Sequence, residues 1–233
     1  MKRTPARRSA IDPIRAASAR ASPPEAPAAC SLCPRLVAYR KANAKAEPSW
    51  FNGAVPSFGD ANARLLIVGL APGRSGANRT GRPFTGDYAG ELLYRTLLEF
   101  GFASGAYKAD PGDGLQLRDA MITNAVRCAP PENRPTPAEI TTCRIYFSAR
   151  LAALARLRVV LALGRVAHDQ ALAALGLRKA QYPFAHGARH DLGANGVLYD
   201  SFHCSRYNTN TGRLTPEMFR SVFAAIRQEI DAG

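Results

Sequence analysis

The sequence has few cysteines, few acidic residues and no long hydrophobic run. Its longest apolar candidates, such as residues 65–70, fall far short of the roughly 18 consecutive apolar residues that span a membrane. The amino-terminal residues lack the apolar core of a secretory signal. Five cysteines in 233 residues are too few for a disulfide scaffold and odd in number, which favours a reducing compartment. We therefore expect a soluble, cytoplasmic protein.

Acidic residues are outnumbered, with 18 Asp and Glu against 31 Lys and Arg, and the formal net charge is +13. Such a surplus predicts a polyanionic partner. Residues 1–29 carry +4 and are rich in Ala, Pro and Ser, so we expect a disordered basic tail. That tail either adds loose phosphate contacts or has no specific role. Residues 30–233 keep a charge of +9 and are expected to form a single domain.

Short apolar runs alternate with helical patterns along the rest of the chain. The runs are continuous rather than alternating, which is typical of parallel strands covered on both faces. Strands are expected at residues 64–70, 121–127, 158–163 and 197–202, and helices at 88–100, 137–156, 166–175 and 216–231. This alternation predicts an α/β sandwich with a parallel sheet. Ligands of such sheets bind beyond the carboxyl ends of the strands, so the loops there are candidates for chemistry.

The first of these loops, residues 69–87, holds five glycines between a strand and a helix. Such a loop can cradle phosphate on its backbone N–H groups. It contains no Lys and lacks the G-x-G-x-x-G spacing, which argues against a nucleotide-triphosphate hydrolase. Three arginines, Phe84 and Asp87 make it long for a purely structural loop.

The other two loops also carry polar candidates. The proline-rich loop at residues 129–137 presents Asn133 and Arg134, and it either holds a polar group still or only connects strand to helix. The third loop begins at His203, which could act as general acid, anion stabiliser, metal ligand or structural residue. We expect the remaining histidines to be surface or structural residues.

The cysteines suggest a metal site. Cys30 and Cys33 form C-x-x-C, Cys128 is expected to end the second strand, and Cys143 lies in the following helix. Four thiolates suit either zinc or an iron–sulfur cluster, and the lack of a second C-x-x-C favours the cluster. A redox C-x-x-C is disfavoured because the motif lies outside any strand–helix junction. Cys204 is left as an unligated fifth thiol.

Taken together, these motifs resemble family 5 (type b) of the uracil-DNA glycosylase superfamily, whose members carry an iron–sulfur cluster. The resemblance covers nearly all of residues 30–230, through VPSFGD, GLAPGRSGANRTGRPFTGD, VRCAPPENRPTP, GLRKAQYPFAHGA and HCSRYNTNTGRLT. It implies a three-layer α/β/α sandwich with a central four-stranded parallel sheet. It also implies a monomer that removes uracil from DNA by hydrolysis in base excision repair. The resemblance places a 4Fe–4S cluster on Cys30, Cys33, Cys128 and Cys143.

The resemblance also implies roles for individual residues. Asp87 would position or activate water, and the backbone carbonyl of Asn133 would help to hold that water. His203 would stabilise the leaving base as an anion. Residues expected to bind the substrate are Leu70, Ala71, Gly73, Phe84 as the stacking aromatic, Asn124, Asn208 and Arg206. Arg79, Arg82 and Arg206 are expected near phosphates.

Two features depart from the common pattern of the superfamily that the motifs resemble. Leu70 and Ala71 are apolar where most members carry a polar water activator, which makes Asp87 the main candidate. Asn124 either reads the edge of uracil or caps the end of a strand, and hypoxanthine remains a further candidate base. The alternative function is a non-catalytic DNA-binding module with an iron–sulfur or zinc site. Only catalysis explains Asp87, Phe84 and His203 on one edge.

Overall fold

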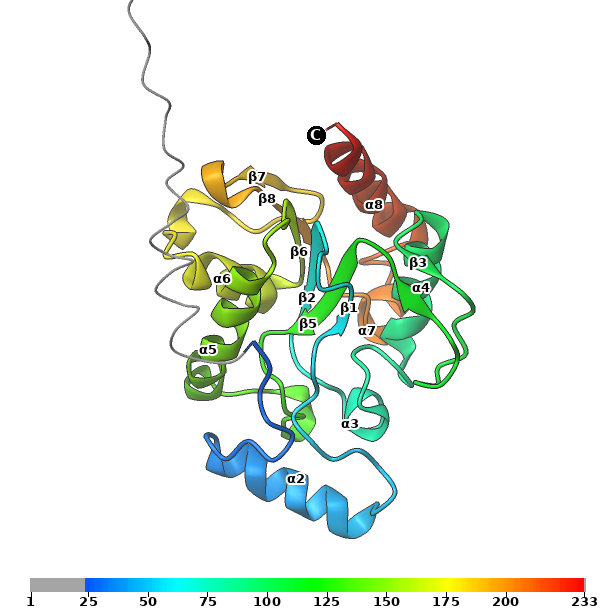
Figure 1. The fold of residues 1–233 in the computed structure, drawn as a ribbon, viewed down its shortest axis with the longest axis vertical. Helices are drawn as coiled ribbons and strands as arrows, with labels where there is room; N and C mark the ends of the chain where they lie inside the picture. The colour runs from blue at the N-terminus through cyan, green and yellow to red at the C-terminus, as the bar shows by residue number, and fades with distance from the viewer. Residues whose placement is uncertain (1–23, 233) are drawn as a thin grey trace, which may run out of the picture.

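A six-stranded sheet forms the centre of the molecule in the computed structural model, which describes residues 24–232 (Figure 1). Its strand order is β1-β5-β2-β6-β8-β7. The four central strands are parallel: β5 (Ala120–Asn124), β2 (Leu65–Gly69), β6 (Val159–Leu163) and β8 (Val197–Ser201). The antiparallel edge strands are β1 (Phe58–Gly59) and β7 (Arg189–Asp191). The expected central parallel sheet of four strands is confirmed, with two short strands added at its edges.

Helices cover both faces of this sheet. Leu65 and Ile67 of β2 face one core with α4 (Tyr88–Glu99) and α8 (Pro216–Asp231). The intervening Leu66 and Val68 face a second core with α5 (Pro137–Ala153) and α6 (Arg165–Ala174). Every residue of the four central strands is buried, which explains why their sequences are continuously apolar rather than alternating. The three-layer α/β/α sandwich is confirmed (Figure 1).

Local signals fix where the long helices begin. The Thr136 side chain accepts a hydrogen bond from the Glu139 N–H, and the Glu139 carboxylate accepts one from the Thr136 N–H, which is a capping box. The Thr215 side chain caps α8 by accepting a hydrogen bond from the Met218 N–H, without a return bond. Proline follows each Thr at the first helical position, where its missing N–H costs nothing.

Sequence patterns did not reveal several other elements. These are α2 (Pro34–Ala46), α3 (Ala77–Thr80), α7 (Arg206–Asn210), the ribbon of β3 (Ala103–Ser104) with β4 (Gln116–Leu117), and the 3₁₀ turns η1 (Pro131–Asn133), η2 (Lys179–Gln181) and η3 (Gly193–Asn195). Within α2, only Leu36 and Asn43 are buried. A helix that buries so little apolar surface leaves no periodic hydrophobic pattern to detect.

The amino-terminal boundary differs from the expected one. Residues 24–29 were expected to be disordered, but Ala26 packs beside Leu36 in a small third core. The Glu25 carboxylate forms ion pairs with Arg127, at 3.0 Å, and with Arg150. The Arg127 side chain is buried and needs a carboxylate to balance its charge, which explains why this segment is ordered. The rest of the expected tail, residues 1–23, lies outside the described residues.

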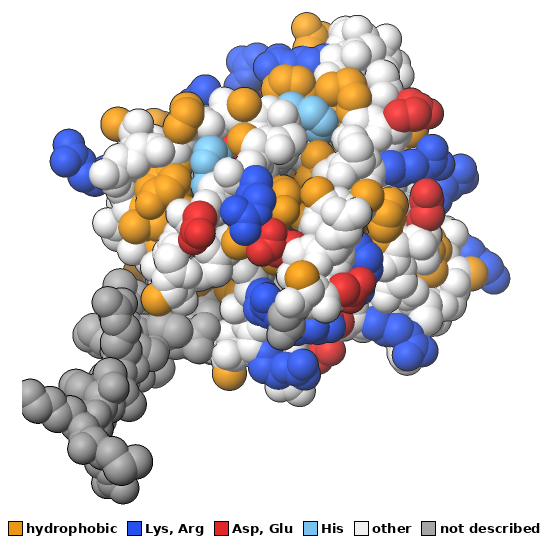
Figure 2. All heavy atoms as spheres, turned by 90° about the horizontal axis from the view of Figure 1, so that it is seen from above, with side chains coloured by type: hydrophobic (Ala, Val, Ile, Leu, Met, Phe, Trp, Pro, Cys, Tyr) orange, Lys and Arg blue, Asp and Glu red, His pale blue; other side chains and the backbone are white. Residues whose placement is uncertain are grey.

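The surface shows no simple charge pattern on the face that looks away from α2. There, basic side chains lie between acidic ones and small apolar areas (Figure 2). No helix within residues 24–232 is long and apolar enough to cross a membrane.

Candidate active site

A cleft with a volume of about 530 Å³ opens at the carboxyl edge of the sheet. Because parallel strands end at the same edge, the loops that follow β2, β5 and β8 meet there. The structure brings seven of the predicted site residues together in its lining: Leu70, Ala71, Gly73, Asp87, Asn133, His203 and Arg206. The remaining predicted residues, Phe84, Asn124 and Asn208, lie around this cleft rather than on its open wall.

Asp87 lies at the beginning of α4. Its Oδ1 accepts a hydrogen bond from the Gly90 N–H at 3.3 Å, which holds the carboxylate at the amino terminus of that helix. Burial raises the pKa of Asp87, which makes the carboxylate a stronger base than an exposed one. A Cβ added at Gly76 would lie 2.4 Å from Asp87 Oδ2, and one at Gly73 would lie 3.3 Å away. These two glycines therefore let the first loop close over a carboxylate.

His203 follows β8 and lines the same cleft as Asp87. Its imidazole stacks on the Phe84 ring, with centroids 5.7 Å apart and planes 27° apart. Burial lowers the pKa of His203 to about 4, so the ring is neutral at pH 7 and carries one N–H donor. The Asn208 Nδ2 donates to the His203 carbonyl at 2.8 Å and holds the backbone of this loop. Asn208 thus contacts the backbone of His203 rather than the cleft.

Phe84 and Asn124 meet at the end of β2. A Cβ added at Gly69 would lie 2.6 Å from the Phe84 ring and 2.4 Å from Asn124 Oδ1. Both side chains are buried, and Asn124 Oδ1 has no hydrogen-bond partner among the described residues. An unpaired buried acceptor is costly unless a ligand supplies a donor. This favours the interpretation of Asn124 as a base-reading residue over that of a strand cap.

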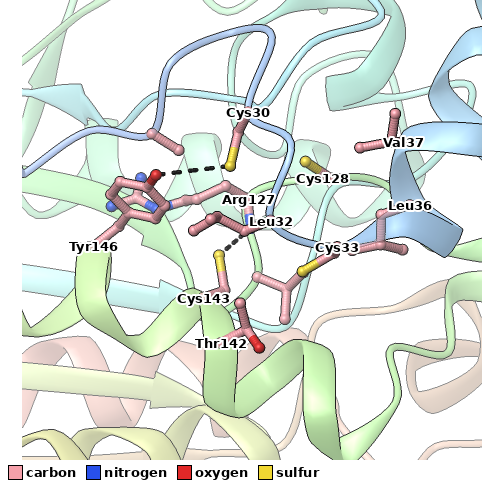
Figure 3. A pocket seen from close by; sticks show the side chains of 12 residues that line it. Cys30, Leu32, Cys33, Leu36, Val37, Arg127, Cys128, Thr142, Cys143 and Tyr146 are labelled. Atoms are coloured by element: carbon pink, nitrogen blue, oxygen red, sulfur yellow. Dashed lines mark hydrogen bonds between the residues drawn. The ribbon is translucent and has the colours of Figure 1, made fainter.

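The four predicted metal ligands gather in one pocket between α2 and α5. Figure 3 shows the Cys30, Cys33, Cys128 and Cys143 side chains around a common space. Cys128 lies four positions past Asn124, the last residue of β5, so its expected position at the end of a strand is wrong. Cys204 is buried elsewhere, in the core beneath α4 and α8.

Donors already point at these sulfurs. The Arg127 N–H donates to Cys143 Sγ at 3.3 Å, and Arg40 Nη1 donates to Cys128 Sγ at 3.5 Å. Burial raises the pKa of Cys128 to about 11 and that of Cys143 to about 12, so as free groups both are thiols at pH 7. A bound metal would reverse this by stabilising the thiolates.

A sequence model of the Uracil DNA glycosylase superfamily matches residues 56–227, which include every residue of the cleft described above. The chain belongs to the uracil DNA glycosylase superfamily. It is 50% identical to the type-5 uracil-DNA glycosylase of Thermus thermophilus, over 83% of this chain and 90% of that protein. It is 43% identical to the type-5 uracil-DNA glycosylase of Pyrobaculum aerophilum, over 88% and 89%. A type-4 uracil-DNA glycosylase of Archaeoglobus fulgidus is 39% identical over 48% of this chain and 49% of that protein.

The arginines of this superfamily member divide into two groups. Arg206 lies at the cleft with its guanidinium 5.3 Å from the Tyr88 ring centre, and Arg79 is exposed nearby. Arg82 was expected near phosphate, but its guanidinium is buried and forms two hydrogen bonds of 2.8 Å with Asp113. That expectation is wrong, because a carboxylate 31 positions along the chain already occupies the side chain.

Two further residues complete the cleft: Arg74, one of the three arginines expected on the first loop, and Tyr88, which sequence reasoning missed. Arg74 lines it, with Nε donating to Asn43 Oδ1 at 2.8 Å and the guanidinium 5.0 Å from the Trp50 ring centre. Tyr88 lines it directly after Asp87. The position of Tyr88 next to Asp87 was a usable signal, whereas nothing local links Arg74 to Asn43 on α2.

Proposed function

We propose that this chain hydrolyses the N-glycosidic bond of uracil in DNA and leaves an abasic site, as a monofunctional enzyme of base excision repair. The observation that carries this proposal is the meeting of Asp87 and neutral His203 in one cleft, with Phe84 and Asn124 at its inner end. The names of the type-5 relatives, 42–50% identical over most of the chain, support the same activity. DNA is then the polyanion that the +13 charge favours.

The target base must leave the duplex before it can enter this cleft. Phe84 offers a ring on which the flipped base can stack, and Asn124 Oδ1 offers an acceptor for the N3–H of uracil. Tyr207, which is 72% exposed on α7 directly after the cleft residue Arg206, would fill the space that the base vacates. Arg74 and Arg206 supply positive charge for the flanking phosphates.

Bond cleavage develops positive charge on the sugar and negative charge on the departing uracil. The Asp87 carboxylate complements the sugar and orients a water molecule, together with the backbone carbonyl of Asn133 on the opposite loop. The single N–H of neutral His203 donates to the uracil oxygen that becomes anionic. A positioned donor of this kind contributes about 100- to 1,000-fold in rate. Leu70 and Ala71 leave the cleft without another carboxylate on this loop.

We further propose that Cys30, Cys33, Cys128 and Cys143 hold a 4Fe–4S cluster. The lack of a second C-x-x-C and the Arg40 and Arg127 donors to the sulfurs support this assignment over zinc. The cluster would tie the segment before α2 to α5 and so act structurally, because its ligands do not line the catalytic cleft. Purified protein should be brown with broad visible absorbance, and a colourless protein that contains zinc would contradict the cluster.

A uracil-containing oligonucleotide tests the main proposal. Alkaline treatment after incubation cleaves abasic sites, so strand scission at the uracil reports base removal. We expect scission by the wild type, and about a 100-fold or greater loss in His203→Ala, which removes the N–H donor. The control His186→Ala changes a histidine outside the cleft lining. Uracil left intact by folded wild-type protein that still binds DNA would favour the non-catalytic DNA-binding module. A panel with hypoxanthine would define the base range, and light scattering would test the expected monomer.

A further inference from the structure

A second group of metal-ligating side chains lies away from both the cleft and the cysteines. His168 on α6, His190 on β7 and Asp200 on β8 place one ligand atom each within 4.8 Å of the others. Asp200 Oδ1 lies 2.8 Å from His168 Nδ1, and Asp200 Oδ2 lies 3.0 Å from His190 Nε2. All three side chains come from regular elements of the sheet and its covering helix, so their positions are fixed by the fold.

The group is deeply buried. The side chains of His168 and Asp200 are 1% and 0% exposed, and that of His190 is 10% exposed. A carboxylate this far from water needs a positive partner. In residues 24–232 no Lys or Arg pairs with Asp200, and the two histidines are its partners. The balancing charge must therefore lie between the carboxylate and the imidazoles.

Hydrogen bonding restricts where that charge can lie. His168 Nε2 lies 2.9 Å from the Tyr182 carbonyl, which can only accept, so this nitrogen carries a proton. In a neutral His168, Nδ1 then presents a lone pair to Asp200 Oδ1. Two acceptors at 2.8 Å repel unless a cation bridges them. That cation is either a second proton on the ring or a metal ion.

We propose that His168, His190 and Asp200 form a binding site for a divalent transition metal ion, of which Zn²⁺ fits best. Two imidazoles and one carboxylate are typical zinc ligands. A ligating histidine usually donates its other N–H to a backbone carbonyl, as His168 does to Tyr182. Zinc bonds of about 2.0–2.2 Å require the facing nitrogen and oxygen atoms to separate to about 3.4 Å. Metal binding would therefore require the side chains to rotate apart by this amount, with water as the fourth ligand.

The metal would join three elements that lead to the catalytic loop. Asp200 is the fourth residue of β8, and His203 follows it three positions later, just after the strand ends. A zinc ion would fasten this end of β8 to β7 and α6 and so hold the His203 loop against the sheet. The site does not depend on the proposed glycosylase activity, and its test uses no DNA.

Metal content measures the proposal directly. Full-length wild type, His190→Gln and the control His186→Gln are treated with EDTA, incubated with excess Zn²⁺, gel-filtered and analysed for zinc and iron. The Gln at position 190 keeps an N–H donor for Asp200, so the fold should survive, and thermal melting checks this. His186 lies four positions before His190 in the sequence, and it does not belong to the group of His168, His190 and Asp200.

We expect wild type and His186→Gln to bind one Zn²⁺ more than His190→Gln, with equal iron in all three proteins. Wild type should also show a melting temperature that rises with Zn²⁺ concentration, and His190→Gln should not. Co²⁺ at this site should give weak visible bands without the intense near-ultraviolet band of cobalt thiolates. Two results would contradict the proposal: equal zinc in wild type and His190→Gln, or a cobalt–thiolate band for the extra ion. Either would show that His168, His190 and Asp200 form only a hydrogen-bonded ion pair.

Discussion

Gly76→Ala should displace the Asp87 carboxylate and slow uracil excision by about 100-fold. The added Cβ would lie 2.4 Å from Asp87 Oδ2 and 2.9 Å from its Cβ and Cγ, and real Cβ contacts below 3.0 Å hardly occur. The Asp87 carboxylate must therefore move by about 1 Å to reach an ordinary contact distance. A misplacement of about 1 Å in a catalytic group can cost about 100-fold in rate.

Gly73, in the same loop, offers a milder substitution as a control. A Cβ at Gly73 would lie 3.3 Å from Asp87 Oδ2, which a shift of a few tenths of an ångström relieves. Gly73→Ala should therefore cost about tenfold or less. The assay is the single-turnover rate on a uracil-containing oligonucleotide with enzyme in excess. DNA affinity, measured in parallel by fluorescence anisotropy, should change little because Arg74 and Arg206 are retained.

A double-mutant cycle shows whether the effect passes through the carboxylate. In an Asp87→Ala background, Gly76→Ala should add less than about threefold, because the group that it displaces is gone. Two results would refute the reasoning: wild-type rates for a folded Gly76→Ala variant, or a full 100-fold loss that persists in the Asp87→Ala background. Thermal unfolding of each variant separates displacement from loss of fold.

Three further predictions address the amino-terminal segment, His203 and the arginines. Glu25→Gln should lower the free energy of unfolding by about 3 kcal/mol in urea, because it leaves the buried Arg127 without its carboxylate; a loss below about 1 kcal/mol would contradict this. The pKa of His203 is about 4 when folded. It is about 6.5 when unfolded. The unfolded state thus binds the proton first, and stability should fall by up to about 3 kcal/mol between pH 6.5 and 4, a dependence that His203→Gln should remove. Arg206→Gln should reduce the salt dependence of DNA binding by about one phosphate contact, whereas Arg82→Gln should leave it unchanged and lower stability instead; equal slopes for both variants would oppose the assignment.

Residues whose environment is set locally or by the sheet were predictable. The continuous apolar sequence of β2 identified a strand covered on both faces, and the Thr136 cap identified the beginning of α5. Parallel strands end at one edge, so Asp87 and His203 could be expected in one cleft without any knowledge of their distance. These features follow from periodicity and topology alone.

Features that depend on a distant partner were not predictable. Nothing near Arg82 reveals that Asp113 will occupy its guanidinium, and nothing near Glu25 reveals that the buried Arg127 requires it. The glycines of the first loop suggested phosphate, but two of them pack against a carboxylate instead. In each case the sequence showed which type of residue was present, but not which distant residue it would contact.

The requirement for the Asp87 carboxylate in uracil excision tests the central claim most directly. Wild type, Asp87→Asn and the control Asp169→Asn, whose aspartate pairs with Lys179 on the surface, are incubated with a uracil-containing oligonucleotide and treated with alkali. We predict cleavage at the uracil by wild type and Asp169→Asn, and loss of nearly all cleavage in Asp87→Asn with DNA binding retained. Cleavage by Asp87→Asn at the wild-type rate, or none by wild type, would contradict the account.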